Sequence, residues 1–287
     1  MQIKEYNKFI KISGESFDLA STFESGQCFR WNAIDKDTYL GVVNSKAVLI
    51  TKNEDQSVDI YNVSPDEFKK YFYWYFDFDK DYNQIIDELI GKDKILQKAV
   101  LKYNGMRLLN QEPFECMISF IISQNNNIKR IKGIIERLCE RYGRQIIFNQ
   151  NILYSFPEPE DLKDVKLEDL LSIGLGYRAE YVIDAVKKVL DGEIILEELE
   201  EVEYEQAKKE LKKIKGIGDK VADCILLYSL KKYNSFPLDV WTKRVLNNLY
   251  GFKSKYDIET FIKSLGEYAG YAQLFLFHYI RMNGGML

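Results

Sequence analysis

The first 63 residues alternate between apolar and polar positions, as a β-rich segment does. The stretch TYLGVVNSKAVLITKN is rich in β-branched residues and is divided at Asn44-Ser45, which predicts a hairpin. SVDIYNV predicts a further strand, and Cys28–Trp31 predicts a short strand after Ser25-Gly26. We therefore expect an antiparallel sheet at the N-terminus.

The pattern becomes mostly helical after residue 64. Ser64 is suited to cap a helix, and Pro65 is suited to its first turn. Pro113 opens the apolar run FECMISFIIS, and residues 127–141 form an amphipathic run. The fold class expected is α+β, with an antiparallel β domain over residues 1–105, including flanking helices, and a larger all-α domain over 106–287.

Length and charge agree with a folded protein of about two domains. The chain has 287 residues, of which 46% are hydrophobic, and its net charge is −4. This mild acidity excludes a basic coat but leaves room for one local basic face. The sequence contains no run of about 18 apolar residues, so it predicts no membrane-spanning helix. The first residues lack the continuous apolar stretch of a secretory signal peptide. We expect a cytoplasmic protein, associated with the nucleoid if the source is prokaryotic.

The cysteines and the single histidine narrow the chemistry. The four cysteines are widely separated and form no C-x-x-C pair, which disfavours structural zinc and iron–sulfur clusters. A Ser–His–Asp or Cys–His arrangement would have to use His278. Catalysis is therefore expected from Lys, Asp, Glu, Tyr or Cys.

Residues 206–230 predict two short helices joined by a tight turn at Gly216-Ile217-Gly218. The glycines permit positive φ, and Ile217 can tuck between the helices as in a helix-hairpin-helix. Asp219 is expected to cap the second helix, Lys220–Leu230, whose free N–H groups can hold a phosphate oxygen. An ordinary αα-hairpin would account for the same pattern, so phosphate binding is left open by the turn alone.

Lys220 lies in the first turn of that second helix. The helix dipole and partial burial both disfavour a cation there, and an uncharged amine is a nucleophile. Asp239, in FPLDVW, could accept a proton near such a lysine, or it could simply cap the following helix. A surface lysine and a capping aspartate are the alternatives.

At these residues the sequence resembles a known family. GIGDKVADC and FPLDVW resemble the helix-hairpin-helix and Pro/Asp motif of base-excision DNA glycosylases, in particular the human-type 8-oxoguanine DNA glycosylases. FESGQCFRW, ISQNNNIKRI, IGLGYRAEYV and YAGYAQLFLF resemble further segments of that family in the same order. The resemblance extends over nearly the whole chain.

The resemblance implies a bifunctional glycosylase and AP lyase that excises 8-oxoguanine opposite cytosine. In this family a lysine matching Lys220 attacks C1′ and forms a Schiff base, after which β-elimination cuts the strand. An aspartate matching Asp239 stabilises the developing positive charge. The base pocket matches four residues, which contact the two base faces, the Watson–Crick edge and N7–H: Cys224, Phe277, Gln273 and Gly26.

The implied partner is duplex DNA containing 8-oxoguanine, bound by a monomer without a membrane, a metal or an organic cofactor. Asn125 and Tyr177 match residues that fill the gap left by the flipped base, and Arg130 and Arg178 match those that read the opposite cytosine. Gly216 and Gly218 would hold a phosphate. The residues expected to form one basic face are Arg130, Lys132, Lys213, Lys215, Lys243 and Arg244.

The chain departs from the family pattern at Trp241, where human-type proteins carry a histidine, so Trp241 either stacks or packs. His278 is interpreted as structural, and Met106 and Arg107 have no assigned place. Two other functions stay open: a monofunctional alkyl-base glycosylase that uses water as the nucleophile, and a non-catalytic DNA-binding protein that retains the hairpin. The presence of Lys220 and Asp239 together argues against both.

Overall fold

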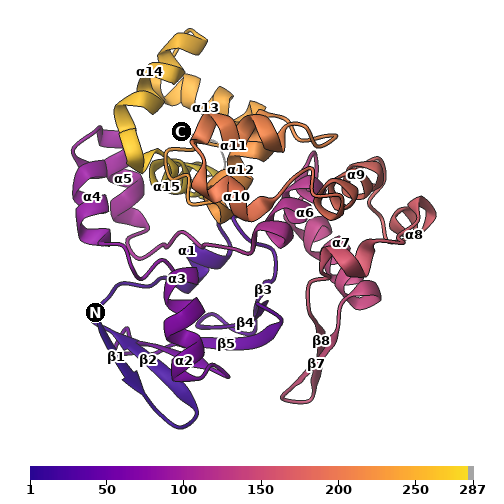
Figure 1. Cartoon of the computed structure of the whole chain (residues 1–287). Coiled ribbons are helices and arrows are strands. Elements are labelled where there is room, and N and C mark those ends of the chain that lie inside the picture. The colour runs from indigo at the N-terminus through magenta and orange to yellow at the C-terminus, as the bar shows by residue number, and fades with distance from the viewer. Residues whose placement is uncertain (284–287) are drawn as a thin grey trace.

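A six-stranded antiparallel sheet forms one end of the molecule, with the strand order β1-β2-β6-β5-β4-β3 (Figure 1). The computed structural model describes residues 1–283, apart from the side chains of Val240, Trp241 and Val245. The strands are β1 (Gln2–Glu5), β2 (Phe9–Ser13), β3 (Trp31–Ala33), β4 (Thr38–Val43), β5 (Lys46–Lys52) and β6 (Val58–Tyr61). The predicted N-terminal sheet is confirmed.

The predicted hairpin is formed by β4 and β5. Its two turn residues, Asn44 and Ser45, have φ values of 47° and 56°, which give the twist that a two-residue hairpin needs. The predicted strand at Cys28–Trp31 is wrong for its first three residues, because β3 begins at Trp31. The preceding loop is held by Gln27, whose amide donates to the carbonyl oxygens of Thr22 at 2.9 Å and Arg107 at 2.8 Å, so no strand ladder forms there.

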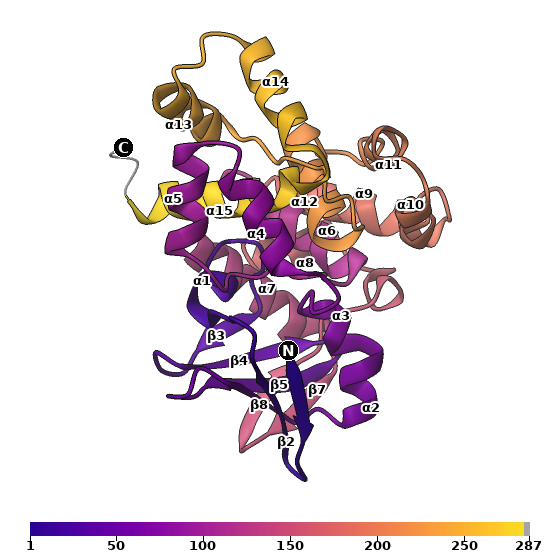
Figure 2. The same ribbon diagram turned by 90° about the vertical axis from the view of Figure 1, so that its left-hand side faces the viewer.

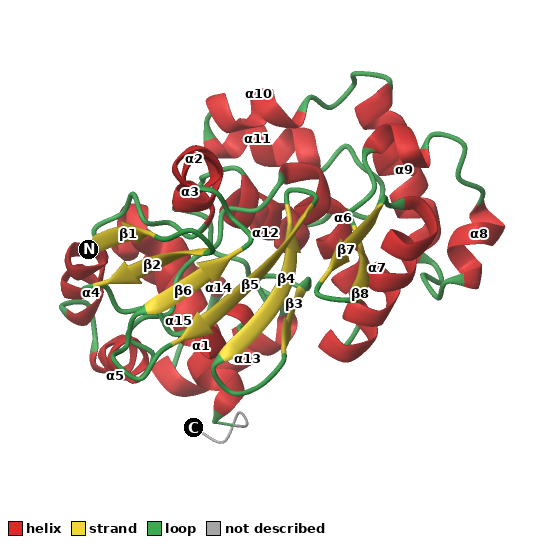
Figure 3. Ribbon diagram, turned by 90° about the horizontal axis from the view of Figure 1, so that it is seen from below, coloured by secondary structure: helices red, strands yellow, loops and turns green. Residues whose placement is uncertain are grey.

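The remainder of the chain is mainly helical and packs beside the sheet (Figures 2 and 3). The shorter elements are α1 (Leu19–Phe23), α2 (Pro65–Glu67), η1 (Phe68–Phe72), α3 (Tyr73–Tyr75), η2 (Pro159–Leu162), α8 (Leu167–Ser172), α10 (Leu196–Glu201) and η3 (Gly266–Tyr268). The longer helices are α4 (Tyr82–Ile90), α5 (Lys94–Lys102), α6 (Pro113–Ser123), α7 (Ile128–Tyr142), α9 (Arg178–Leu190), α11 (Tyr204–Leu211), α12 (Asp219–Ser229), α13 (Val240–Tyr250), α14 (Lys255–Leu265) and α15 (Ala269–Met282). Within residues 1–283, no helix is both long and apolar enough to cross a membrane.

The expectation that residues 106–287 are all α-helical is wrong at one place, where a second β-hairpin interrupts the helices. It consists of β7 (Gln145–Phe148) and β8 (Asn151–Tyr154), joined at Asn149 and Gln150, which have φ values of 46° and 66°. The β-branched residues on both sides of Asn149-Gln150 were the sequence signal for it. The hairpin reaches back to β5, so the helical part also contacts the sheet (Figure 3).

The molecule has two hydrophobic cores, and the boundary between them along the chain does not fall at residue 105. The sheet core takes in residues of β2 to β6 together with Phe68 to Phe78 and Leu109. The helical core takes in Leu89 of α4 and Leu96 of α5, which both precede residue 105. Helices α4 and α5 therefore belong by packing to the helical domain, where α5 lies against α15 (Figure 2).

Arg107, which had no assigned place in the sequence, links the two cores. Its side chain is 1% exposed and donates to the carbonyl oxygens of Phe76 and Asp77, each at 2.8 Å. The Asp77 carboxylate accepts from the hydroxyls of Tyr82 and Tyr271, each at 2.9 Å. Since Tyr271 belongs to α15, this network ties the C-terminal helix to the chain that leaves the sheet.

Candidate active site

The turn between α11 and α12 requires glycine at Gly216 for two reasons. Its φ is +83°, which side chains rarely adopt, and a Cβ there would lie 2.2 Å from Cδ2 of Tyr181. Ile217 is buried between the helices, and its amide donates to the Ile214 carbonyl at 3.1 Å. The predicted helix-hairpin-helix is present in this form.

Asp219 does not cap α12 as predicted; it is the first residue of the helix. Gly218 occupies the N-cap position with φ −95° and offers no side chain to the first turn. The Asp219 carboxylate instead accepts from Lys212 at 2.7 Å. Because no side chain occupies the first N–H groups of α12, they can bind an anion such as a phosphate.

The lysines beside the turn are partly neutralised. Lys213 pairs with Glu210 and Lys215 pairs with Glu180, both at 2.5 Å. In addition, the backbone amide of Lys215 donates to Asp184 at 2.7 Å, which anchors the turn to α9. Their contribution to DNA binding is accordingly smaller than their number indicates.

Lys220 and Cys224 lie on one face of α12, as their i, i+4 spacing predicts. The Lys220 amine lies 5.4 Å from the centre of the Phe120 ring and its side chain is half-buried. Burial raises the pKa of the Cys224 thiol to about 11; the charge of Lys220 opposes this rise, and the charges of Asp223 and Asp239 add to it. The thiol is therefore a neutral contact surface rather than a nucleophile.

Asp239 caps α13, because its Oδ1 accepts from the Thr242 amide at 2.6 Å. This confirms the capping alternative without excluding a catalytic one, since a carboxylate has a second oxygen. No ion pair joins Lys220 and Asp239 among the described residues, but the charges of both act on the Cys224 thiol. The uncharged state expected for Lys220 stays a prediction.

Four of the predicted pocket residues come from distant parts of the chain. Gln273 is buried, donates to the Pro237 carbonyl at 3.2 Å and lies 3.3 Å from the Tyr228 hydroxyl. Gly26 has φ +90°, and a Cβ on it would lie 3.6 Å from Cε1 of Phe277. The structure thus brings the loop before β3 against α15. Because Cys224 and Gln273 are almost inaccessible, a base reaches them only after neighbouring groups move.

The residues predicted to surround the flipped base divide into exposed and buried ones. Asn125, Arg130 and Tyr177 are exposed, and Asn125 has φ 47° in the loop between α6 and α7. Arg178 is only 3% exposed, and its guanidinium donates to the carbonyl oxygens of Gln124 and Asn125. Arg178 therefore holds this loop and does not lie on a solvated face. That Arg178 recognises the opposite cytosine stays a prediction. To do so, its guanidinium would have to give up the bonds to these carbonyl oxygens for bonds to the base.

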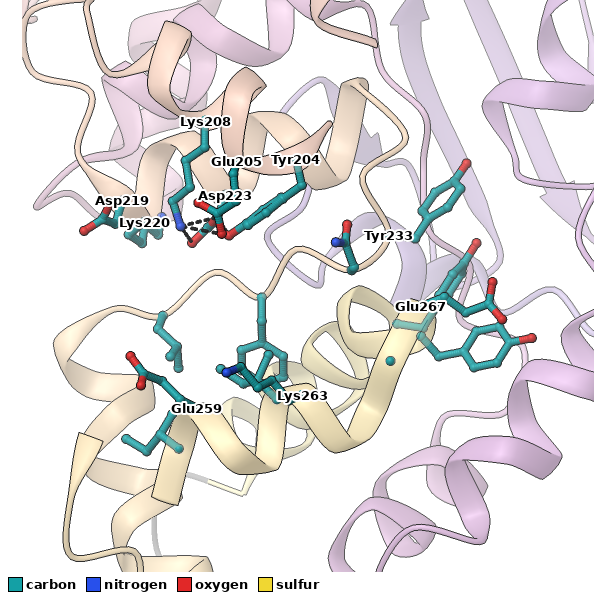
Figure 4. Close-up of a pocket in the computed structure, with 18 of the residues that line it drawn as sticks. Tyr204, Glu205, Lys208, Asp219, Lys220, Asp223, Tyr233, Glu259, Lys263 and Glu267 are labelled. Carbon is teal, nitrogen blue, oxygen red and sulfur yellow. Dashed lines mark hydrogen bonds and ion pairs between the residues drawn. The ribbon is translucent and has the colours of Figure 1, made fainter. Parts of the chain in front are cut away.

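A cleft of about 1600 Å³ lies beside the hairpin, between α11 and α12 on one side and α14 on the other (Figure 4). Lys220 lines it, whereas Cys224 and Phe277 are not among its lining residues. Ten lysines and six acidic residues line this cleft, although the net charge of the chain is −4. The cleft is therefore locally basic, but of the six residues predicted to form one basic face only Lys243 lines it, and that face stays a prediction.

A cluster in this cleft was missed from the sequence: Tyr204, Lys208 and Asp223 (Figure 4). Asp223 follows Lys220 within the hairpin motif, but no periodic pattern connects it with residues of the preceding helix. His278 is buried against Tyr103, with ring centres 4.4 Å apart, as its structural interpretation predicts. The Trp241 side chain lies outside the described residues.

Comparison with protein families divides the chain in two. Residues 9–117 match the 8-oxoguanine DNA glycosylase N-terminal domain, and residues 118–267 match the HhH-GPD superfamily base excision DNA repair protein domain. A probable N-glycosylase/DNA lyase of Methanothermobacter thermautotrophicus is 34% identical over 67% of this chain and 69% of its own length. The N-glycosylase/DNA lyase of Saccharomyces cerevisiae is 29% identical over 93% of this chain and 84% of its own.

Solved structures extend the similarity to the whole chain. The 8-oxoguanine glycosylase/lyase of Clostridium acetobutylicum, in complex with DNA containing cytosine opposite 8-oxoG, is 36% identical, with a TM-score of 0.94 and 99% of both chains covered. A 3-methyladenine DNA glycosylase of Archaeoglobus fulgidus shares the fold at 20% identity and a TM-score of 0.78, covering 95% of this chain and 98% of its own. The fold alone thus does not decide which base is removed. The domain matches and the relatives together show that the chain belongs to the 8-oxoguanine DNA glycosylase/lyase family of the HhH-GPD superfamily.

Proposed function

We propose that this protein removes 8-oxoguanine from duplex DNA, preferentially opposite cytosine, and then cleaves the strand at the resulting abasic site. The observation that carries the proposal is the position of Lys220 in the first turn of the hairpin's second helix, on the wall of the cleft, with Asp239 capping the helix that follows. Family membership supplies the substrate class, since the relatives are named glycosylases and DNA lyases.

Lys220 is proposed as the nucleophile. Its Nζ lone pair forms a bond to C1′ as the bond from C1′ to N9 breaks, and the base leaves with that electron pair and takes up a proton. The cationic nitrogen loses a proton, its lone pair then forms the C1′–N double bond as the C1′–O4′ bond breaks, and O4′ keeps that electron pair and takes up a proton, which gives the protonated imine. Removal of a C2′ proton expels the 3′ phosphate and breaks the strand.

Asp239 is proposed to stabilise the positive charge that develops on the sugar. Its carboxylate lies at the N-terminus of α13, the positive end of the helix dipole. The bond from the Thr242 amide fixes one oxygen and therefore the direction of the carboxylate. A fixed negative group acts on a transition state without having to reorganise.

The pocket residues are proposed to select the base. Cys224 and Phe277 would contact its two faces, Gln273 its Watson–Crick edge and Gly26 its N7–H. One hydrogen bond to Gly26 contributes about 1 kcal/mol, so rejection of guanine requires the other contacts as well. Asn125 and Tyr177 would fill the space left in the duplex, since unstacking a base costs a few kcal/mol.

Borohydride trapping on duplex DNA containing 8-oxoguanine tests the proposal. The wild type should form a covalent adduct, and Lys220→Gln should form none, because a carboxamide cannot give an imine. Lys220→Gln should still bind the duplex, which separates loss of chemistry from loss of folding. An adduct that persists in Lys220→Gln would place the nucleophile elsewhere.

Two further substrates define the specificity. Excision should be fastest opposite cytosine; equal rates opposite all four bases would contradict the reading roles of Arg130 and Arg178. A duplex containing 3-methyladenine should not be a substrate. Release of that base without any trapped adduct would support the monofunctional alternative instead.

A further inference from the structure

Asp223 lies in the hairpin motif beside Cys224, yet the proposed reaction gives it no role. It is 6% exposed, and its carboxylate lies 2.7 Å from the Tyr204 hydroxyl and 2.8 Å from the Lys208 amine (Figure 4). Burial raises the pKa of this carboxyl, and the bonds from Lys208 and Tyr204 counteract the rise. Burying an ion pair costs desolvation free energy that the attraction between the two charges often only offsets. The presence of Asp223 at this position therefore calls for an explanation.

Asp223 joins three segments of the chain. Tyr204 and Lys208 belong to α11, Asp223 itself belongs to α12, and the Ser235 hydroxyl approaches it from the segment after α12. The Ser235 Oγ lies 2.9 Å from the Asp223 carbonyl oxygen and 3.3 Å from its carboxylate. One residue therefore connects both helices of the hairpin to the segment that continues toward Asp239.

That segment, residues 233–239, is held at three successive points. Ser235 is held by Asp223, the Tyr233 carbonyl accepts from the Gly270 amide at 2.7 Å, and the Pro237 carbonyl accepts from Gln273 at 3.2 Å. Gly270 allows this approach, since a Cβ there would lie 2.8 Å from the Tyr233 oxygen. Two of the three points depend on α15, and only the Ser235 point depends on the hairpin.

We propose that Asp223 is a positioning residue, which fixes the Ser235–Asp239 segment to α12 and so holds Asp239 in register with Lys220. The bonds from Lys208 and Tyr204 fix the direction of the carboxylate. The inference rests on the proposed function, because it assigns a consequence to the relative placement of Lys220 and Asp239. Displacing a catalytic group by about 1 Å can lower a rate by 100-fold.

Three variants separate the parts of this arrangement. Asp223→Ala removes the carboxylate with its bonds to Tyr204, Lys208 and Ser235, and leaves only the bond from Ser235 to the backbone carbonyl of position 223. It should lower the single-turnover excision rate roughly 10- to 100-fold. Asp223→Asn keeps an oxygen for Tyr204 and Ser235 and should recover part of that rate. Ser235→Ala removes both bonds that tie the segment to α12, so its rate should fall at least as far as that of Asp223→Asn. The dissociation constant for a duplex with an uncleavable abasic analogue should change less than twofold in all three.

Glu200→Gln is the matched control. Glu200 pairs with Lys231, just after the end of α12, and joins α10 to it as Lys208 joins α11 to Asp223. That pair is more exposed than the Lys208–Asp223 pair, and among the described residues it forms no hydrogen bond or ion pair with residues 235–239, so its loss should leave the rate unchanged. Rates are compared below the melting temperature of every variant, so that all molecules are folded.

The outcomes are distinct. Excision rates of Asp223→Ala and Ser235→Ala well below the wild-type rate, with Asp223→Asn closer to the wild type and DNA affinity constant, support the positioning role. An Asp223→Ala protein that melts earlier but excises at the wild-type rate while folded would overturn it, as would equal losses for Asp223→Asn and Asp223→Ala. Absence of excision by the wild type would instead refute the proposed function.

Discussion

Asp77 and Asp223 are both buried carboxylates, but their surroundings differ in kind. Asp77 accepts from two tyrosine hydroxyls and lies beside Arg107 at the junction of the two cores. Asp223 pairs with Lys208 on the wall of an open cleft and connects three segments near Lys220. Burial raises the pKa of both carboxyls, so both local structures depend on their donors. The junction network ties the two cores together, whereas the cleft-wall network connects the hairpin to the segment that leads to Asp239.

The largest effect on stability is expected at the junction. Arg107→Met leaves the carbonyl oxygens of Phe76 and Asp77 without their buried donor and should lower the free energy of unfolding by about 3–5 kcal/mol. Urea unfolding measures the loss. The fraction that remains folded should still form the borohydride adduct at the wild-type rate. A slower adduct in that fraction would show that the two regions are coupled.

Two groups outside both regions should oppose each other in the pH dependence of stability. Burial raises the pKa of Glu115 to about 7 from 4.5, so the unfolded chain releases a proton that the folded chain keeps, and stability falls as pH rises between these values. Burial lowers the pKa of His278 to about 4 from 6.5, so stability rises with pH over that range. Each effect amounts to at most about 3 kcal/mol.

Replacing either Glu115 or His278 should therefore reveal the effect of the other group on the pH dependence of stability. Between pH 4.5 and 6.5, the urea midpoint of Glu115→Gln should rise with pH more steeply than that of the wild type. The midpoint of His278→Gln should rise less steeply, or fall. Parallel curves for all three proteins would contradict both assignments.

At the cleft wall, Asp239→Asn should change rate without changing stability. Asparagine caps a helix about as well as aspartate, so the free energy of unfolding should stay within about 0.5 kcal/mol of the wild-type value. Loss of the negative charge should lower the single-turnover rate of adduct formation by roughly 100-fold. A full rate in Asp239→Asn would reduce Asp239 to a helix cap.

The smallest effect concerns the surface lysines. Lys243 is exposed and has no ion pair among the described residues, whereas Lys213 pairs with Glu210. If each phosphate contact contributes ~0.9 to the salt slope of DNA binding, Lys243→Gln should lower that slope by about one and Lys213→Gln by less than half as much. The dissociation constant for duplex DNA, measured at several salt concentrations for each variant, gives these slopes. Equal changes in slope would show that the Lys213–Glu210 ion pair breaks when DNA binds.

The features that could be predicted are those encoded locally. The β4–β5 turn, the α6 and α13 starts and the Gly216–Gly218 turn depend on residues close in sequence. The β7–β8 hairpin is equally local, but its two strands have only four residues each and lie between segments whose pattern predicts helices. Asp219 was misplaced by one position, because glycine can occupy an N-cap as well.

The features that could not be predicted depend on partners far apart in the chain. Arg107 binds carbonyl oxygens about 30 residues earlier, and Asp223 binds Tyr204 and Ser235 from two other segments. Nothing in the spacing of these residues shows that they meet. The same holds for Gly26 and Phe277, which only the family resemblance placed together.

The central claim is that the Lys220 amine is the atom that bonds to deoxyribose. Peptide mapping by mass spectrometry after borohydride reduction and trypsin digestion tests it directly. The account predicts the sugar remnant on Lys220, within a peptide spanning residues 216–231 in which trypsin has not cut after the modified lysine. A remnant on Lys208 or Lys212, which line the same cleft, would contradict it.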